Sequence, residues 1–69
     1  MGLREYRKSK GITQKLLAEK VGVKQVTISQ YESGVRTPDL KMAKKLADAL
    51  EITLDGFYQL IVSILETPL

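Results

Sequence analysis

Only three residues, Gly22, Val23 and Lys24, separate two stretches of helical patterning, and this short connection constrains the fold more than any other feature of the sequence. The stretches on either side both place apolar side chains at helical spacing. The glycine can adopt the left-handed backbone conformation that ends a helix. A connection this short forces the two helices to cross at a steep angle.

The rest of the chain is also helical in pattern, with Gly and Pro at the joints and no alternating run of β-branched residues. We expect an all-α fold in a single domain spanning 1–69, because 69 residues can build only one modest core. Hydroxyl or carboxylate oxygens of Thr13, Asp39 and Thr53 are expected to cap helix starts. The five expected helices cover residues 3–10, 13–21, 24–33, 39–50, and a last segment from 53 to just before Pro68.

The residue types present argue against catalysis and metal binding. The chain contains no Cys and no His, so it lacks the commonest general base, the commonest thiol nucleophile and most metal ligands. Its carboxylates are scattered, and no pair has a helix spacing that converges on one pocket. We therefore expect a protein that is not an enzyme, with no metal, no cofactor and no small-molecule ligand.

Charge is segregated along the chain. Residues 1–45 hold all eleven Lys and Arg and four acidic residues, whereas residues 46–69 hold four acidic residues and no basic one. The first region favours a polyanion as its partner. A mixed solvated surface is the alternative, but it explains the net charge of +3 and not the segregation. The C-terminal apolar segment, about a dozen residues, is too short to cross a bilayer, so we expect a cytoplasmic protein without membrane contact.

Two short helices that cross steeply at a glycine-containing turn describe a helix-turn-helix, whose second helix lies in the DNA major groove. In the second helix of this pair, Ile28 and Tyr31 face one side and are expected to pack inward. The other side carries short or amide-bearing side chains where Lys and Glu are usual. These outward positions are Gln25, Val26, Ser29, Gln30 and Ser33, with Thr27 near the boundary.

The sequence resembles the lambda-repressor-like, or Xre-type, helix-turn-helix domains of phage and bacterial regulators. The resemblance covers residues 3–58 and rests on GITQ at 11–14, LAEKVGV at 17–23, IS at 28–29, YESG at 31–34, the Pro38-Asp39 helix start and LADALEIT at 46–53. It implies a compact five-helix DNA-binding domain with the helix-turn-helix at helices 2 and 3. It also implies that the commonest role is transcriptional repression by a homodimer.

The resemblance assigns base contacts to four positions: Gln25, Val26, Thr27 and Gln30. A Gln amide can bond to both N6 and N7 of adenine, and the methyl groups of Val and Thr can pack on a thymine methyl. An A·T-containing half-site is therefore expected. The positions expected to contact the DNA backbone are Gln14, Lys24, Ser29, Ser33, Gly34, Val35 and Arg36.

Several of these assignments have a plain structural alternative. Gln14, which in the family contacts a phosphate and braces the recognition helix, could simply be a half-buried residue between helices. Lys24 departs from the family, which usually has Ser or Thr there as a helix cap. Lys41 and Lys44 fit a solvated face at least as well as a phosphate contact. The resemblance also implies a structural ion pair between Arg7 and Glu32, which we do not count among the binding residues.

The fifth expected helix carries more apolar residues than one core stripe requires. Leu54, Tyr58, Ile61 and Leu65 form the expected core stripe, and a second stripe contains Phe57, Leu60 and Ile64. The second stripe either packs on the first helix or forms a dimer interface, and we favour the dimer interface formed by the segment 53–69. Two-fold pairing would present two recognition helices to successive major grooves about 34 Å apart, which predicts an inverted-repeat operator.

The sequence thus predicts a sequence-specific double-stranded DNA-binding transcriptional regulator, a repressor that acts as a homodimer. The alternative is a protein-interaction module or antitoxin of the same fold, in which the C-terminal surface binds a partner protein. Phosphate contacts distinguish the two, because they make DNA affinity fall steeply as salt rises.

Overall fold

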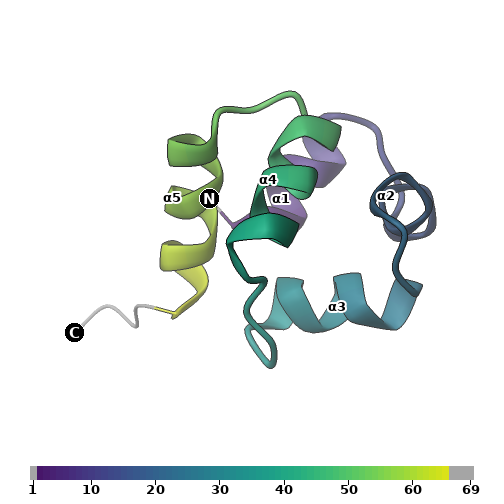
Figure 1. Ribbon diagram of the computed structural model, residues 1–69, viewed down its shortest axis with the longest axis horizontal. Coiled ribbons are helices and arrows are strands. Elements are labelled where there is room, and N and C mark those ends of the chain that lie inside the picture. Colours follow the sequence, from purple (N-terminus) through teal and green to yellow (C-terminus); the bar gives the residue numbers. More distant parts are fainter. Residues whose placement is uncertain (1, 66–69) are drawn as a thin grey trace.

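The computed structural model describes the backbone of residues 2–65 and the side chains of residues 2–62. Within this part of the chain there are five helices and no strand: α1 (Leu3–Ser9), α2 (Gln14–Val21), α3 (Gln25–Ser33), α4 (Leu40–Ala49) and α5 (Leu54–Leu65). Figure 1 shows α3 along one edge of the molecule, with α2 and α5 at opposite ends and α1 and α4 between them. The predicted all-α, five-helix fold is confirmed.

Three helices begin at the side-chain caps that the sequence predicts. The hydroxyl of Thr13 accepts the Leu16 N–H at 3.0 Å, and Asp39 Oδ1 accepts the Met42 N–H at 2.8 Å. Thr53 Oγ1 accepts the Gly56 N–H at 3.1 Å at the start of α5. Each bond satisfies one of the backbone donors that a helix leaves free in its first turn.

The turn between α2 and α3 depends on Gly22. Its φ of 77° is in the left-handed region, and its N–H bonds to the Ala18 carbonyl at 2.9 Å. A Cβ at this position would meet no atom within 4 Å, so the backbone conformation, not space, requires glycine here. In Figure 1, α2 is seen nearly end-on while α3 runs across the page, which is the steep crossing expected for so short a connection.

One hydrophobic core joins all five helices. Leu17 and Val21 of α2 lie in it together with Ile28 and Tyr31 of α3. The predicted apolar stripe of the fourth helix is buried along its full length: Ala43, Leu46 and Ala47 of α4 and Leu50 at its C-cap. This packing fixes α3 by one side only, so its opposite side is left outside the core.

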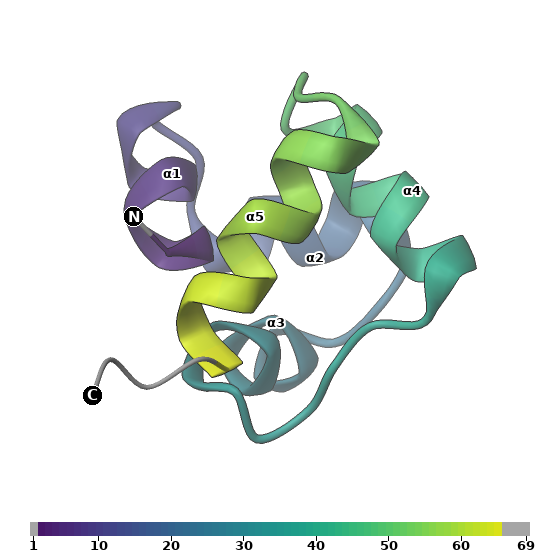
Figure 2. The ribbon, with the colours of Figure 1, turned by 90° about the vertical axis from the view of Figure 1, so that its left-hand side faces the viewer.

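The fifth helix corrects the predicted dimer interface. Phe57 and Leu60 are buried in the core of the single chain, so they do not form an exposed seam. Because α5 packs against both α1 and α4, as Figure 2 shows, it needs an apolar face wider than one stripe. Tyr58, expected in the core, is instead exposed together with Val62. The third predicted seam residue, Ile64, lies outside the described side chains.

Among the described residues other than glycine, Glu51 alone has a positive φ, 56°. It follows Leu50, the residue that ends α4, and the next residue, Ile52, donates its N–H back to the Ala47 carbonyl at 3.0 Å. A left-handed conformation costs a residue with a Cβ roughly 1–2 kcal/mol, and glycine avoids that cost.

We predict that Glu51→Gly raises the free energy of unfolding by about 0.5–1 kcal/mol, because the strain removed exceeds the added chain entropy of glycine. Thermal unfolding followed by circular dichroism should show a Tm higher by several degrees, on the order of 4–8 °C per kcal/mol. Glu51→Ala is the control, since it removes the same carboxylate but keeps the Cβ. Equal Tm values for the two variants would contradict the prediction.

Candidate nucleic-acid interface

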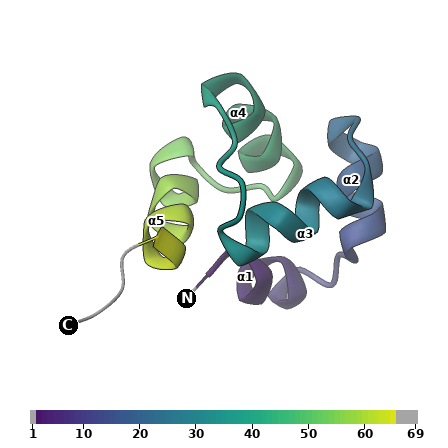
Figure 3. The same cartoon turned by 90° about the horizontal axis from the view of Figure 1, so that it is seen from below.

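The helix α3 presents one open side to the surroundings, and Figure 3 shows it crossing the face of the molecule that is seen from below. Gln25 and Val26 are exposed at its start, and Val26 shows 58% of its surface. Ser29 and Ser33 are exposed one and two turns further on. These four short or amide-bearing side chains form a continuous surface that we call the α3 face.

The other two predicted base-contacting residues lie at the border of this surface. Gln30 is half-buried, and Thr27 is half-buried on the side of α3 that faces α4. Helical periodicity predicts only that Thr27 lies near the boundary between the inward and outward sides of α3. How much of its side chain is covered depends on the position of α4. Ser29, predicted to contact the backbone, is more exposed than either residue.

A buried ion pair holds α3 to α1. Glu32 accepts from Arg7 through both carboxylate oxygens, with Arg7 Nε at 2.5 Å from Oε2 and Nη2 at 3.3 Å from Oε1. The Arg7 side chain is 7% exposed and the Glu32 side chain is 4% exposed. Arg7 Nη1 also donates to the Ile12 carbonyl at 2.7 Å, which fixes the loop that leads into α2. The family-implied ion pair is therefore present and buried.

Gln14, the first residue of α2, connects this ion pair to the α3 face. Its Nε2 donates to Glu32 Oε1 at 3.0 Å, and its Oε1 accepts from Gln25 Nε2 at 3.4 Å. The predicted bracing of the recognition helix is thus a direct hydrogen bond to Gln25. The further bond to Glu32 is a contact that sequence reasoning missed, because it joins residues 18 positions apart.

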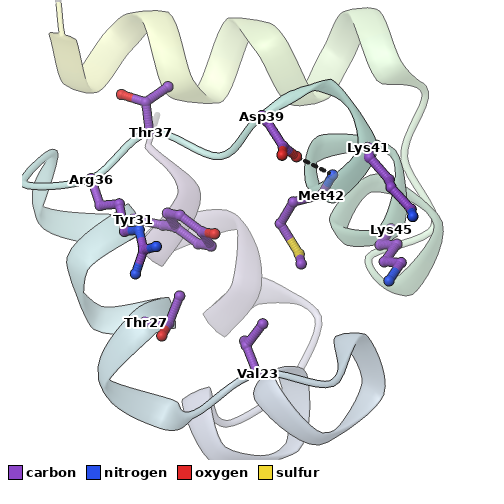
Figure 4. Close-up of a pocket in the computed structure, with 9 residues that line it drawn as sticks. All are labelled: Val23, Thr27, Tyr31, Arg36, Thr37, Asp39, Lys41, Met42 and Lys45. Atoms are coloured by element: carbon purple, nitrogen blue, oxygen red, sulfur yellow. Dashed lines mark hydrogen bonds between the residues drawn. The ribbon is translucent and has the colours of Figure 1, made fainter.

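A polar groove of about 440 Å³ runs beside α3 on the side of α4. Its lining residues are Val23, Thr27, Tyr31, Arg36, Thr37, Asp39, Lys41, Met42 and Lys45. In Figure 4, Arg36 lies at one end of the groove, and Lys41 and Lys45 lie at the other. The Arg36 N–H bonds to the Gln30 carbonyl at 3.2 Å, which holds this loop against the end of α3.

The cations around α3 are only partly those that the sequence predicts. Arg36 is exposed as expected, and Lys41, for which two readings were open, shares its groove. Lys45 was not singled out, although Lys41 and Lys45 are one helical turn apart. On the other side of α3, Arg4 lines a small hollow with Gln14, Ser29, Glu32 and Ser33. The α3 face is therefore bordered by positive charge on both sides.

The remaining predicted backbone-contacting residues surround the two ends of α3. Lys24 is exposed at the helix start and caps nothing with its side chain, in agreement with its departure from the usual Ser or Thr. At the helix end, Gly34 has a φ of 83°, and Val35 is 76% exposed. No helix within residues 2–65 is long and apolar enough to cross a membrane.

Comparison with known proteins agrees with this geometry. A family model described as helix-turn-helix matches residues 3–57. The chain belongs to this family, the lambda-repressor-like or Xre-type helix-turn-helix domains. The match covers the two crossing helices and the α3 face between its cationic borders.

Individual relatives are similar over most of this chain. An uncharacterised HTH-type transcriptional regulator from Methanothermobacter thermautotrophicus is 48% identical over 48 residues, 70% of each chain. Another from Archaeoglobus fulgidus is 38% identical over 56 residues, 81% of this chain and 80% of the relative. The cryptic phage CTXphi transcriptional repressor RstR from Vibrio cholerae is 38% identical over 53 residues, 77% of this chain and 47% of the repressor.

We predict that Arg7→Ala lowers the free energy of unfolding by about 3–5 kcal/mol, because it leaves Glu32 buried without its cation. Chemical denaturation measures this loss directly. Arg4→Ala is the matched control, since Arg4 lies on the same helix but is exposed, and it should change stability by less than about 0.5 kcal/mol. Similar losses in the two variants would show that the ion pair contributes no special stability.

Proposed function

We propose that this chain is a sequence-specific double-stranded DNA-binding transcriptional regulator, with α3 in the major groove. The observation that carries the proposal is the α3 face, whose short polar and apolar side chains lie between Arg4 on one side and the cationic groove on the other. The side chains of the α3 face can contact base edges, and the cations on its two sides can neutralise phosphates. The names of the relatives, which include transcriptional regulators and a repressor, support the same role.

Base recognition in this proposal begins with Gln25 and Val26, the exposed residues at the start of α3. The Gln25 amide can pair with adenine, and the Val26 side chain can pack on a thymine methyl. Gln30 and Thr27, at the border of the α3 face, would contact neighbouring bases in the groove. Together these four residues favour a half-site that contains A·T pairs.

Backbone contacts in this proposal come from both ends of α3. Gln14 and Lys24 approach one strand near the helix start, and Ser29 and Ser33 supply hydroxyl groups along the α3 face. The backbone N–H groups of Gly34 and Val35, with the Arg36 side chain, approach the other strand. Lys41 and Lys45 extend this second set, because they border the same groove as Arg36.

We further propose that the regulator is a homodimer on an inverted-repeat operator. Since Phe57 and Leu60 are buried, the exposed apolar residues Tyr58 and Val62 of α5 are the better candidates for the contact between copies. Selection of bound sites from random DNA tests this arrangement. A dimer would select an inverted repeat with half-site centres about 10–10.5 base pairs apart or a multiple of this, whereas a monomer would select single half-sites.

The salt dependence of DNA affinity tests the proposed function. We expect the logarithm of the binding constant for duplex DNA to fall linearly with the logarithm of salt concentration, with a slope of about −0.9 for each phosphate contacted. Fluorescence anisotropy over a range of salt concentrations measures this slope. No binding at low salt would reject DNA recognition and favour a protein-interaction module, for which exposed Tyr58 and Val62 offer a surface.

Two substitutions distinguish base contacts from backbone contacts. Gln30→Ala should relax preference at one base pair at a cost of about 1–3 kcal/mol, because a base-edge contact is lost. Lys24→Ala should weaken binding to all sequences alike and reduce the salt slope by about 1, because a phosphate contact is lost. Anisotropy measurements with the selected site and its single-base variants test both. Unchanged affinity and preference in both variants would show that the assignment of the α3 face is wrong.

A further inference from the structure

A line of hydrogen bonds runs from the interior of the protein to the exposed start of α3. It begins at Arg7 and passes through Glu32 and Gln14 to Gln25. Glu32 is 4% exposed, whereas Gln25 is exposed. The line therefore connects a side chain that is almost fully buried with one that we have proposed to read a base.

The hydrogen bonds along this line have a fixed donor-to-acceptor direction, which Glu32 determines. Its carboxylate accepts three N–H donors, two from Arg7 and one from Gln14, and donates none. Since an amide donates only through nitrogen, Gln14 must turn its Nε2 towards Glu32 and its Oε1 away from it. The reverse orientation would place two acceptor oxygens against each other.

The orientation of Gln14 then determines that of Gln25. Gln14 Oε1 accepts from Gln25 Nε2 at 3.4 Å, so one N–H of Gln25 is used inside the protein. The groups that remain on Gln25 are Oε1 and its second N–H, one acceptor and one donor. Adenine offers the matching donor and acceptor at N6 and N7 in the major groove, whereas guanine offers two acceptors, O6 and N7.

We infer that Glu32 is a specificity-determining positioning residue, which makes Gln25 select adenine over guanine by fixing the direction of the Gln14 and Gln25 amides. Without an acceptor-only group at the inner end, both amides could reverse together, and Gln25 would then present N–H donors that guanine accepts. The buried carboxylate thus disfavours guanine at a base pair that it does not itself contact. This inference rests on the proposed DNA-binding function.

The test first locates the base pair that Gln25 reads. Selection from random DNA with the unmodified protein gives the preferred site, and the pair whose preference Gln25→Ala abolishes is the one in question. Affinities for that site with A·T or G·C at this pair are then measured for the unmodified protein and for Glu32→Gln. Thermal unfolding establishes the temperature at which each variant remains folded.

We expect the unmodified protein to bind the adenine-containing site about tenfold or more tightly than the guanine-containing site. Glu32→Gln should reduce this affinity ratio to about twofold or less, because the introduced amide can either accept a hydrogen bond from position 14 or donate one to it. A purely structural role of Glu32 would weaken binding to both DNAs alike and leave their ratio unchanged. An unchanged ratio in the folded variant would overturn the inference.

Two double variants keep the test decisive. Arg7→Met/Glu32→Gln removes both charges, so it avoids an unpaired buried cation if Glu32→Gln alone fails to fold, and it should lose the adenine preference in the same way. Glu32→Gln/Gln14→Glu moves the carboxylate next to Gln25 without changing net charge. This variant should recover the adenine preference. Its affinity for all DNA should be lower, because the carboxylate at position 14 cannot donate a hydrogen bond to a phosphate. Failure to recover the preference would overturn the inference.

The outcomes also separate this inference from the proposed function. If the unmodified protein binds no DNA at low salt, both are wrong. If it binds DNA selectively and Gln25→Ala abolishes preference at one base pair, the proposed function stands. An equal adenine-to-guanine ratio for the unmodified protein and Glu32→Gln would then reject only the role of Glu32.

Discussion

The Arg7–Glu32 ion pair is the interaction on which the arrangement of the first three helices depends. It ties α1 to the C-terminal end of α3, and through Gln14 it also holds the start of α2. Burying two charges is costly unless their hydrogen-bonding groups are satisfied, and here Arg7 bonds to both Glu32 and the Ile12 carbonyl. Within the described part of the chain, no buried side-chain nitrogen or oxygen lacks a partner. A shift of one of these helices would break several of these bonds at once.

The fold follows from short-range patterns, and for that reason the sequence predicts most of it. A cap such as Thr13 or Asp39 bonds to a residue three positions ahead, so both partners are visible in one short stretch. The apolar stripe of α4 is set by helical periodicity alone. The steep crossing of α2 and α3 follows from a connection too short to allow anything else.

The parts of the site that sequence missed depend on contacts between distant segments. Phe57 and Tyr58 are neighbours on α5, and only the combined positions of α1 and α4 determine that the first is buried and the second exposed. Arg4 and Lys45 come from the first and fourth helices, and tertiary packing alone brings them to the borders of α3. The link from Gln14 to Gln25 follows in part from the family resemblance, but the inner partner Glu32 does not.

The left-handed Glu51 has a consequence for how such a chain can change over evolutionary time. A single small core without disulfides leaves little excess stability, yet a strained residue persists in the turn between α4 and α5. In Figure 1 this turn lies at the opposite edge of the molecule from α3. Stability gained at that turn could therefore compensate for destabilising substitutions on the α3 face, so that new recognition specificities can arise without loss of the fold.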